Sequence, residues 1–537
     1  MGSGCSAPLP DLPYKDIMAM SFRNDSIVCF YASKAELEIT RNAILRCWPG
    51  GIQREGPKNL DEEHPDVGEP KCYKFKLTGY PFTIGGSKEN STAVRRMATA
   101  MLFELYNLGW KLLVSSDLSR TMDVGTWFFQ KEAHAPMQYP MFCIGISSYD
   151  KFNIIDCPTN LHSVIRDVCT RTWASGIQNE SLDGNVYTIK FNGTPWSYVD
   201  KIQSCTSRLM IREIVGALTG YQVMLYGNTN LKSTADTFFF RYVPNQQAEQ
   251  FTTVSLNRMD RLRLIHMEPN VVSAIENCVR QTWVRGVQEV LDKRPLCYEL
   301  KLRGYPWWCY GEEGVSARLL ICRILETMAS IGYYIVSGLD VTRKDNDKSL
   351  LLFRQGAPMQ ARFLVCSLNS TDKVKLINAP NEVVQAAQRI FALWVLGHQV
   401  KPAAELPPGC SYQVKLNGNP WSNMMVKDGY HGRALLLGLL GAFSDLGWRL
   451  VTSADVSAKY VHQDKGPDYP LDVHSWYFMY DPSLLAQRQP MHQQYGLLYP
   501  TLPVQGGPPP VYYAPPPAYA PPPPGYNQVA PPPMLPQ

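Results

Sequence analysis

One ten-residue motif occurs four times along the chain, and this repetition constrains the fold more than any other feature of the sequence. The motif reads aromatic, any, apolar, Lys, apolar, any, Gly, any, Pro, aromatic, and its copies span residues 73–82, 187–196, 298–307 and 412–421. The motif glycines Gly79, Gly193, Gly304 and Gly418 are separated by 114, 111 and 114 residues. A chain of 537 residues is also too long for one core. The sequence therefore predicts four tandem copies of one module.

Two further signatures recur in the same register. Upstream of each motif lies Trp-x-x-Gly-x-Gln, beginning at Trp48, Trp173, Trp283 and Trp394. Downstream lies a Gly-aromatic pair at Gly109, Gly220, Gly332 and Gly447, where a left-handed glycine suits the end of a helix. Eight residues past these glycines stand Asp117, Asn228, Asp340 and Asp455.

Hydrophobic periodicity gives the expected order of elements within a module. Each copy opens with an apolar strand, expected at residues 27–32, 141–146, 251–256 and 363–368, and a second strand and a helix lead into the Trp signature. The Lys-containing strand ends in the Gly-x-Pro turn, and a second helix and two strands follow. We therefore predict an α+β fold of four tandem two-layer modules of roughly ββαβαββ order.

The predicted boundaries follow from these signatures. We expect an N-terminal acylation segment at 1–26, repeats at 27–131, 140–242, 251–355 and 362–480, and a disordered proline-rich tail at 481–537. The joins between copies are short, which favours a compact row of modules over flexibly linked ones.

Composition excludes several classes of function. The net charge of +5 is small for this length and does not indicate nucleic-acid binding. The 14 cysteines form no CxxC pair and mostly lie in apolar runs, as buried reduced thiols do. The nine histidines are scattered without metal-ligand spacing, and no phosphate-binding glycine loop or GxSxG occurs. We expect no metal, no cofactor and no enzymatic activity.

One lysine is shared by all four motif strands: Lys76, Lys190, Lys301 and Lys415. The first interpretation is structural, with the lysine stem packed on the sheet and its ammonium group on the Asp/Asn after the second helix or on a helix C-terminus. The second is a repeated anion site for phosphoinositide headgroups or phosphopeptides.

The N-terminus, Met1 to Ser6, matches the N-myristoylation pattern, with Gly2 as the acceptor. Cys5 adds a palmitoylation site. Two acyl chains hold a protein at a membrane where one chain binds only marginally. The pattern therefore predicts a tether to the cytoplasmic face of a membrane, the plasma membrane or an endosome, with a cytoplasmic pool.

The tail carries three Pro-Pro-x-Tyr motifs. They are spaced seven residues apart, in a segment that has no Lys, Arg, Asp or Glu after Arg488. The motif residues are Pro509, Pro510 and Tyr512, then Pro516, Pro517 and Tyr519, then Pro523, Pro524 and Tyr526. The motif resembles the ligand of group I WW domains, whose aromatic groove takes polyproline II prolines. This resemblance implies partners such as HECT-type ubiquitin ligases with tandem WW domains. Tyr495 and Tyr526 also begin YxxΦ patterns, which bind clathrin adaptors.

Together these features predict a non-enzymatic, membrane-tethered adaptor that recruits WW-domain proteins. The alternatives are a hydrolase-like enzyme using one diverged repeat, or a repeat protein that binds lipid headgroups or nucleic acid.

Overall fold

The computed structural model describes residues 9, 12, 14–58, 71–83, 87–119, 124–197, 200–231, 235–309, 311–342, 348–394, 397–401, 410–421, 427–457, 460–461, 469–470 and 472–485. Gly2, Cys5, Tyr495 and the three Pro-Pro-x-Tyr motifs lie outside these residues. N-terminal acylation, the disordered tail and the binding of WW domains or clathrin adaptors therefore stay predictions.

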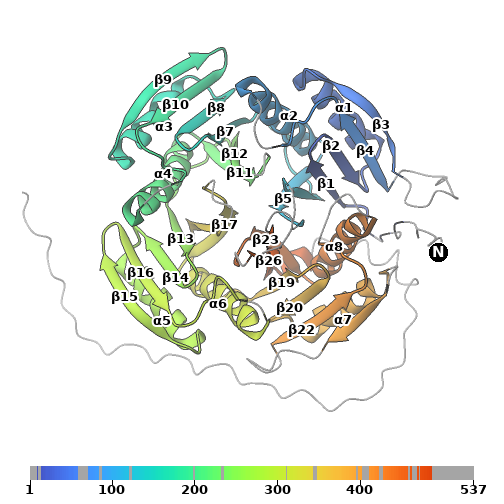
Figure 1. Cartoon of the computed structure of the whole chain (residues 1–537), viewed down its shortest axis with the longest axis vertical. Coiled ribbons are helices and arrows are strands. Elements are labelled where there is room, and N and C mark those ends of the chain that lie inside the picture. The colour runs from blue at the N-terminus through green and yellow to red at the C-terminus, as the bar shows by residue number, and fades with distance from the viewer. Residues whose placement is uncertain are drawn as a thin grey trace, which may run out of the picture. The chain divides into compact units, whose positions relative to one another are not determined.

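The chain forms four α+β modules, each built on a six-stranded antiparallel sheet with two helices (Figure 1). Module 1 consists of β1 (Ile17–Arg23), β2 (Ser26–Phe30), α1 (Lys34–Cys47), β3 (Ile52–Pro57), β4 (Cys72–Leu77), α2 (Lys88–Asn107), β5 (Trp110–Ser116) and β6 (Thr126–Lys131). Module 2 consists of β7 (Phe142–Ser147), β8 (Lys151–Ile155), α3 (Asn160–Thr172), β9 (Ile177–Asp183), β10 (Val186–Phe191), α4 (Lys201–Thr219), β11 (Val223–Thr229) and β12 (Thr237–Tyr242).

Modules 3 and 4 repeat this order. Module 3 consists of β13 (Phe251–Asn257), β14 (Arg261–Ile265), α5 (Pro269–Thr282), β15 (Val287–Lys293), β16 (Cys297–Leu302), α6 (Gly311–Ser330), β17 (Tyr333–Leu339) and β18 (Leu350–Gln355). Module 4 consists of β19 (Phe363–Asn369), β20 (Lys373–Ile377), α7 (Asn381–Phe391), β21 (His398–Lys401), β22 (Ser411–Leu416), α8 (Lys427–Asp445), β23 (Trp448–Ala454) and β26 (Asp472–Tyr480), with a short ladder of β24 (Tyr460–Val461) and β25 (Tyr469–Pro470).

The element order is ββαββαββ, so the predicted order lacked one strand per module. The missing strand follows the Trp-x-x-Gly signature and forms the outer edge of each sheet, in the order β3-β4-β2-β1-β6-β5 in module 1. It was missed because it has few buried positions: all of β9 except Ile177 is exposed. An edge strand with little buried surface leaves no hydrophobic alternation to detect.

Two predicted registers differ from the structure. Module 1 begins with β1 at Ile17, upstream of the expected start at residue 27, which lies in the second strand. In module 2 the left-handed residue that ends the second helix is Gln222 (φ +61°), whereas Gly220 is helical. The four Gly-x-Pro glycines do adopt positive φ, between +75° and +85°, as predicted from the turn.

Both faces of the central strands in each sheet are buried. In β19, Leu364, Cys366 and Leu368 join the core under the helices of module 4, whereas Phe363 and Val365 join the core of module 3. Central strands are therefore apolar at nearly every position, as strands covered on both faces are.

The second face of each sheet packs on the second helix of the preceding module, and we call each such contact a seam. Met141 and Cys143 of module 2 pack in the core of module 1, and Leu339 and Leu350 of module 3 pack in that of module 2. Module 4 packs on module 3 in the same way, and Ile17 of module 1 joins the core of module 4. Seams 1–2, 2–3, 3–4 and 4–1 thus close the modules into a cycle, whereas the short joins had predicted a compact row.

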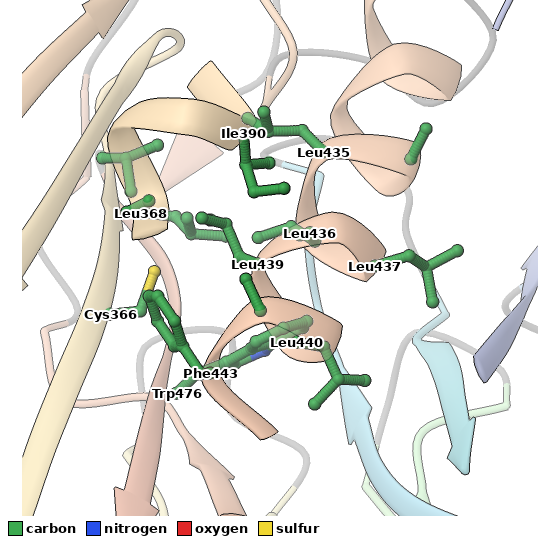
Figure 2. Packing of buried hydrophobic residues seen from close by; sticks show 14 of the residues in the cluster. Cys366, Leu368, Ile390, Leu435, Leu436, Leu437, Leu439, Leu440, Phe443 and Trp476 are labelled. Carbon is green, nitrogen blue, oxygen red and sulfur yellow. The ribbon is translucent and has the colours of Figure 1, made fainter. Parts of the chain in front are cut away.

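Helix α8 shows how a seam shapes a sequence. Leu435, Leu436, Leu437, Leu439 and Leu440 are all buried, so the helix is apolar around its circumference. Figure 2 shows Leu436 and Leu439 turned toward the sheet of module 4, whereas Leu437 points away from it. A helix between two sheets has no solvent-facing stripe to carry polar residues.

Candidate functional site

The four motif lysines occupy equivalent places beside a hairpin aspartate. The Nζ atoms of Lys76, Lys190 and Lys415 lie 3.7, 3.9 and 3.5 Å from carboxylate oxygens of Asp25, Asp150 and Asp372. Each aspartate directly precedes the second strand of its module. The partner predicted for the lysine, the Asp or Asn after the second helix, is thus not the residue that the structure places there.

Module 3 varies this arrangement. Its hairpin residue Asp260 lies 3.8 Å from Arg261, which stands opposite Lys301 in the sheet. In all four modules the hairpin Asp carbonyl also accepts the amide that follows the lysine, as in Asp25 O from Leu77 N at 2.7 Å. Because the lysine side chains of the three pairs are about one-third to two-fifths exposed, each pair contributes at most about 1 kcal/mol.

The aspartate that follows the fifth strand of a module has a structural task. Asp117, Asp340 and Asp455 each accept, through Oδ1, the amide two residues further on at 3.1 to 3.2 Å. In module 2 the equivalent residue is Asn230 and not Asn228. Asn230 directly follows the end of β11, as Asp117 directly follows the end of β5. Asn228 instead donates to Asp236 Oδ2 at 2.7 Å.

The same aspartates form hydrogen bonds across three seams. At each seam two hydrogen bonds run in opposite directions between one aspartate and one residue of the adjacent module, and we call such a pair of bonds a latch. The Asp340 amide donates to Asp236 Oδ2 at 2.7 Å, and the Asp236 amide donates back to Asp340 O at 3.0 Å. Ser349 latches Asp455 in the same way, and His474 latches Asp117. The residue of module 1 that corresponds to Asp236 and Ser349 is Gly125, which directly precedes β6. A Cβ at Gly125 would lie 2.7 Å from Ser115 Oγ.

Two latch groups have displaced pKa values. Burial raises the pKa of Asp236 to about 7, against the hydrogen bonds from Asp340 and Asn228. Burial lowers the pKa of His474 to about 4, so the ring is neutral near pH 7. Its Nδ1 faces the Asp117 amide, which can only donate, so Nδ1 is the acceptor. The Ser453 hydroxyl lies 3.1 Å from the same nitrogen and donates to Ser116 Oγ at 3.0 Å.

A buried arginine on each second helix was missed in the sequence. Arg95, Arg208, Arg318 and Arg433 are at most 3% exposed and stand 14 to 16 residues after the motif glycine. Arg95 Nε donates across seam 1–2 to Thr237 Oγ1 at 3.0 Å, and Nη2 donates to Ile146 O at 2.9 Å. A side chain at Gly145 would overlap the Arg95 guanidinium group. The fourfold spacing was the signal that could have revealed these arginines.

The N-terminal segment docks on α8 at seam 4–1. Leu9 is 5% exposed in the core of module 4, and its carbonyl accepts Lys71 Nζ at 3.1 Å. Leu12 lines a small pocket together with Ile390, Leu393, Trp394 and His431. Gly438 and Gly441 leave room on α8 for this segment: a Cβ at Gly441 would lie 2.7 Å from Tyr14 Cδ1.

The corresponding surface of seam 1–2 is a groove of about 830 Å3. Its walls include Ala93, Phe103, Met141 and Val186. Two ion pairs span the seam beside it, Arg96–Asp156 at 2.8 Å and Lys88–Asp183 at 3.3 Å. Each cation of the groove thus already has a carboxylate partner, which leaves an amphipathic trough and no concentrated charge.

Both ends of the described chain lie at the same end of the sheets. Lys131 N donates to Asp16 O where β1 begins, and Tyr480 N donates to Arg362 O where β19 begins. Arg449 lies 3.0 Å from Asp481 and 4.0 Å from Glu132, which places these ends of modules 4 and 1 side by side. The polypeptide therefore enters near Tyr14 and leaves near Leu485 on one side.

The described part of the chain holds no helix long and apolar enough to span a bilayer. Nor do its residues group three or more His, Cys, Asp or Glu side chains as a metal site needs.

One family model matches the chain four times, over residues 16–130, 140–241, 250–354 and 362–479. The model describes an uncharacterised domain, and its four matches coincide with the four modules. Comparisons with curated proteins and with solved structures gave no match.

Proposed function

Because the chain belongs to a family built from this repeated, uncharacterised domain, with four copies spanning most of its length, we propose that the modules act together as a scaffold. In this proposal the two ends of the chain bind the membrane and the protein partners. The protein is then a membrane-tethered adaptor without enzymatic activity. Its N-terminus anchors it to the cytoplasmic face of a membrane, and its tail recruits WW-domain proteins.

The observation that carries the proposal is the triple Pro-Pro-x-Tyr array. A single motif of this kind binds a WW domain weakly, but linked motifs rebind and gain avidity against tandem WW domains. The even spacing of seven residues presents three equivalent ligands to one partner. HECT-type ubiquitin ligases with tandem WW domains are the partner class that this array fits.

Three structural features support a scaffold with a tether. The residues that the modules share form turns, as the motif glycines do, or make contacts across seams, as the aspartates after the fifth strand and the buried arginines do. The N-terminal segment is docked by Leu9, Leu12 and Tyr14 a few residues after Gly2 and Cys5. The described chain also begins and ends at the same end of the sheets.

The tail is tested by calorimetric titration of the full-length protein with one WW domain and with two linked WW domains. Changing Tyr512, Tyr519 and Tyr526 together to Ala should lose far more affinity than any single change, because avidity disappears with the last pair of motifs. Tyr513→Ala is the matched control, since Tyr513 adjoins a motif without being part of it. Equal affinity of wild type and triple variant would refute the adaptor function.

The tether is tested separately by cell fractionation. Gly2→Ala should move the protein to the soluble fraction, and Cys5→Ser should release part of it, because one acyl chain remains. Ser3→Ala is a neighbouring control that keeps both acceptors. An unchanged membrane fraction for Gly2→Ala would remove the tether and leave the WW-binding test standing on its own.

A further inference from the structure

Two cysteines from different modules meet at seam 2–3. Cys205 lies on α4 of module 2, and Cys297 begins β16 of module 3. Both are almost fully buried and form a small cluster with Ile265, flanked by Leu209 and Leu296, apart from the module cores. The two side chains share this cluster, and both cysteines are free thiols in the structure.

The same position in the other seams holds different residues. Three residues before the buried arginine of the second helix stand Thr92, Val315 and Tyr430, and the facing strands begin with Val186, Ser411 and Cys72. Seam 2–3 alone among these four pairs of positions has sulfur on both sides. The thiol pair is therefore a specialisation of this seam and not a consequence of the repeated fold.

Cations surround the pair. Lys201 Nζ lies 3.1 Å and Arg263 Nε 2.6 Å from the buried carboxylate of Glu299. Arg263 and Arg208 both donate to the hydroxyl of Ser204, the residue next to Cys205, at 2.9 Å. Three cationic side chains thus converge on the helical turn that carries Cys205.

This environment separates Cys205 from the other buried thiols. The neighbouring Cys297 thiol, together with the charges of Arg263, Arg208 and Lys201, lowers the pKa of Cys205 to about 7 despite its burial. Burial raises the pKa of Cys143 to about 11 and that of Cys366 to about 12. Near neutral pH, Cys205 therefore has a large thiolate fraction, and Cys297 remains a thiol because its pKa is raised.

We propose that Cys205 and Cys297 are a reversible oxidation site that joins modules 2 and 3 by a disulfide when the protein meets a peroxide. The Cys205 thiolate attacks one oxygen of hydrogen peroxide, breaks the O–O bond and becomes a sulfenic acid as hydroxide leaves. The Cys297 sulfur then attacks the Cys205 sulfur and forms the S–S bond. The sulfenic hydroxyl leaves with the Cys297 proton as water, so two thiols are oxidised for each peroxide reduced.

The disulfide ties α4 to β16 where Lys201 and Arg263 already meet Glu299. It locks one seam of the cycle and leaves the other three unchanged. Because peroxide is small, brief local opening of the seam is enough to admit it. A cellular dithiol reductant reverses the reaction by thiol–disulfide exchange.

The test uses the full-length protein with Cys5→Ser, reduced and then treated with an equimolar amount of hydrogen peroxide. Non-reducing peptide mapping should show tryptic peptide 202–208 linked to 294–301, with the loss of two hydrogen atoms. The rate should rise with pH around a midpoint near 7. It should exceed oxidation of Cys169 at least about tenfold, because thiolate fraction sets reactivity.

Variants assign the two roles. Cys297→Ser should leave a sulfenic acid on Cys205 that dimedone traps, whereas Cys205→Ser should abolish both the trap and the cross-link. Cys169→Ser is the buried-cysteine control and should retain the cross-link. A wild-type map without the 202–208/294–301 pair, or dimedone on another described cysteine in preference to Cys205, would overturn the proposal.

Discussion

Gly441→Ala tests whether the N-terminal segment is a docked part of the fold. Gly441 lies inside α8, where alanine is ordinarily more stable than glycine by about 1 kcal/mol. At this position the added Cβ would meet the ring of Tyr14, at 2.7 Å from Cδ1. Tyr14 would have to leave α8 and expose apolar surface of the seam. We expect a net destabilisation of about 1 to 3 kcal/mol, because the lost burial exceeds the gain in helix propensity.

The sign should reverse when Tyr14 is absent. In a Tyr14→Ala background nothing opposes the alanine, and Gly441→Ala should stabilise by about 1 kcal/mol. Gly216→Ala on α4 is the matched control: Gly216 also lies eight residues after the buried arginine of its helix, and its Cβ would meet Phe251 Cδ2 at an ordinary 3.7 Å. The assay is urea denaturation followed by circular dichroism for the wild type, Gly441→Ala, Tyr14→Ala and the double variant. A stabilising Gly441→Ala in the wild type, additive with Tyr14→Ala, would show that residues 9–14 do not dock on α8.

Three further predictions concern turns, latches and the lysine pairs. Gly304→Val should lower stability by more than about 1 kcal/mol in a thermal melt, because φ is +80° and the Cβ would lie 2.9 Å from Arg285 Cδ. The pKa of His474 falls from 6.5 to about 4 on folding, so its contribution is present above pH 6.5 and lost as pH falls toward 4. The pKa of Asp236 rises from 3.8 to about 7, so its contribution is present below pH 3.8 and lost as pH rises toward 7. Each changes stability by about 1.4 kcal/mol per pH unit with opposite sign. Relative to the wild type, the melting temperature of His474→Gln should therefore fall further as pH rises from 4 to 7. That of Asp236→Asn should rise relative to the wild type as pH rises from 4 to 6.5. Parallel profiles of melting temperature against pH for the wild type and both variants would contradict this. Lys190→Met should change the melting temperature little, since its pair with Asp150 is exposed; a large loss would mean that the pair is structurally important.

Local and repeated features could be predicted from the sequence alone. The motif spacing predicted four modules, and the family match and the structure confirm them. Hydrophobic periodicity predicted the helix that begins at Pro269 and the strand at Leu262 to Ile265. Turn chemistry predicted the positive φ of Gly304. Such features depend on interactions between near neighbours, and four copies made each pattern easier to recognise.

The seams could be decided only by the tertiary structure. Arg95 finds its acceptors in the next module, Lys76 finds Asp25 in the β1–β2 turn, and Cys205 meets Cys297. Because both faces of the central strands are covered, these strands show no alternation that would say which residues face a neighbouring module. The closure of module 4 on module 1 depends on contacts between the two ends of the repeat array, where Leu12 and Tyr14 meet α8, and sequence periodicity does not encode which distant surfaces will pack together.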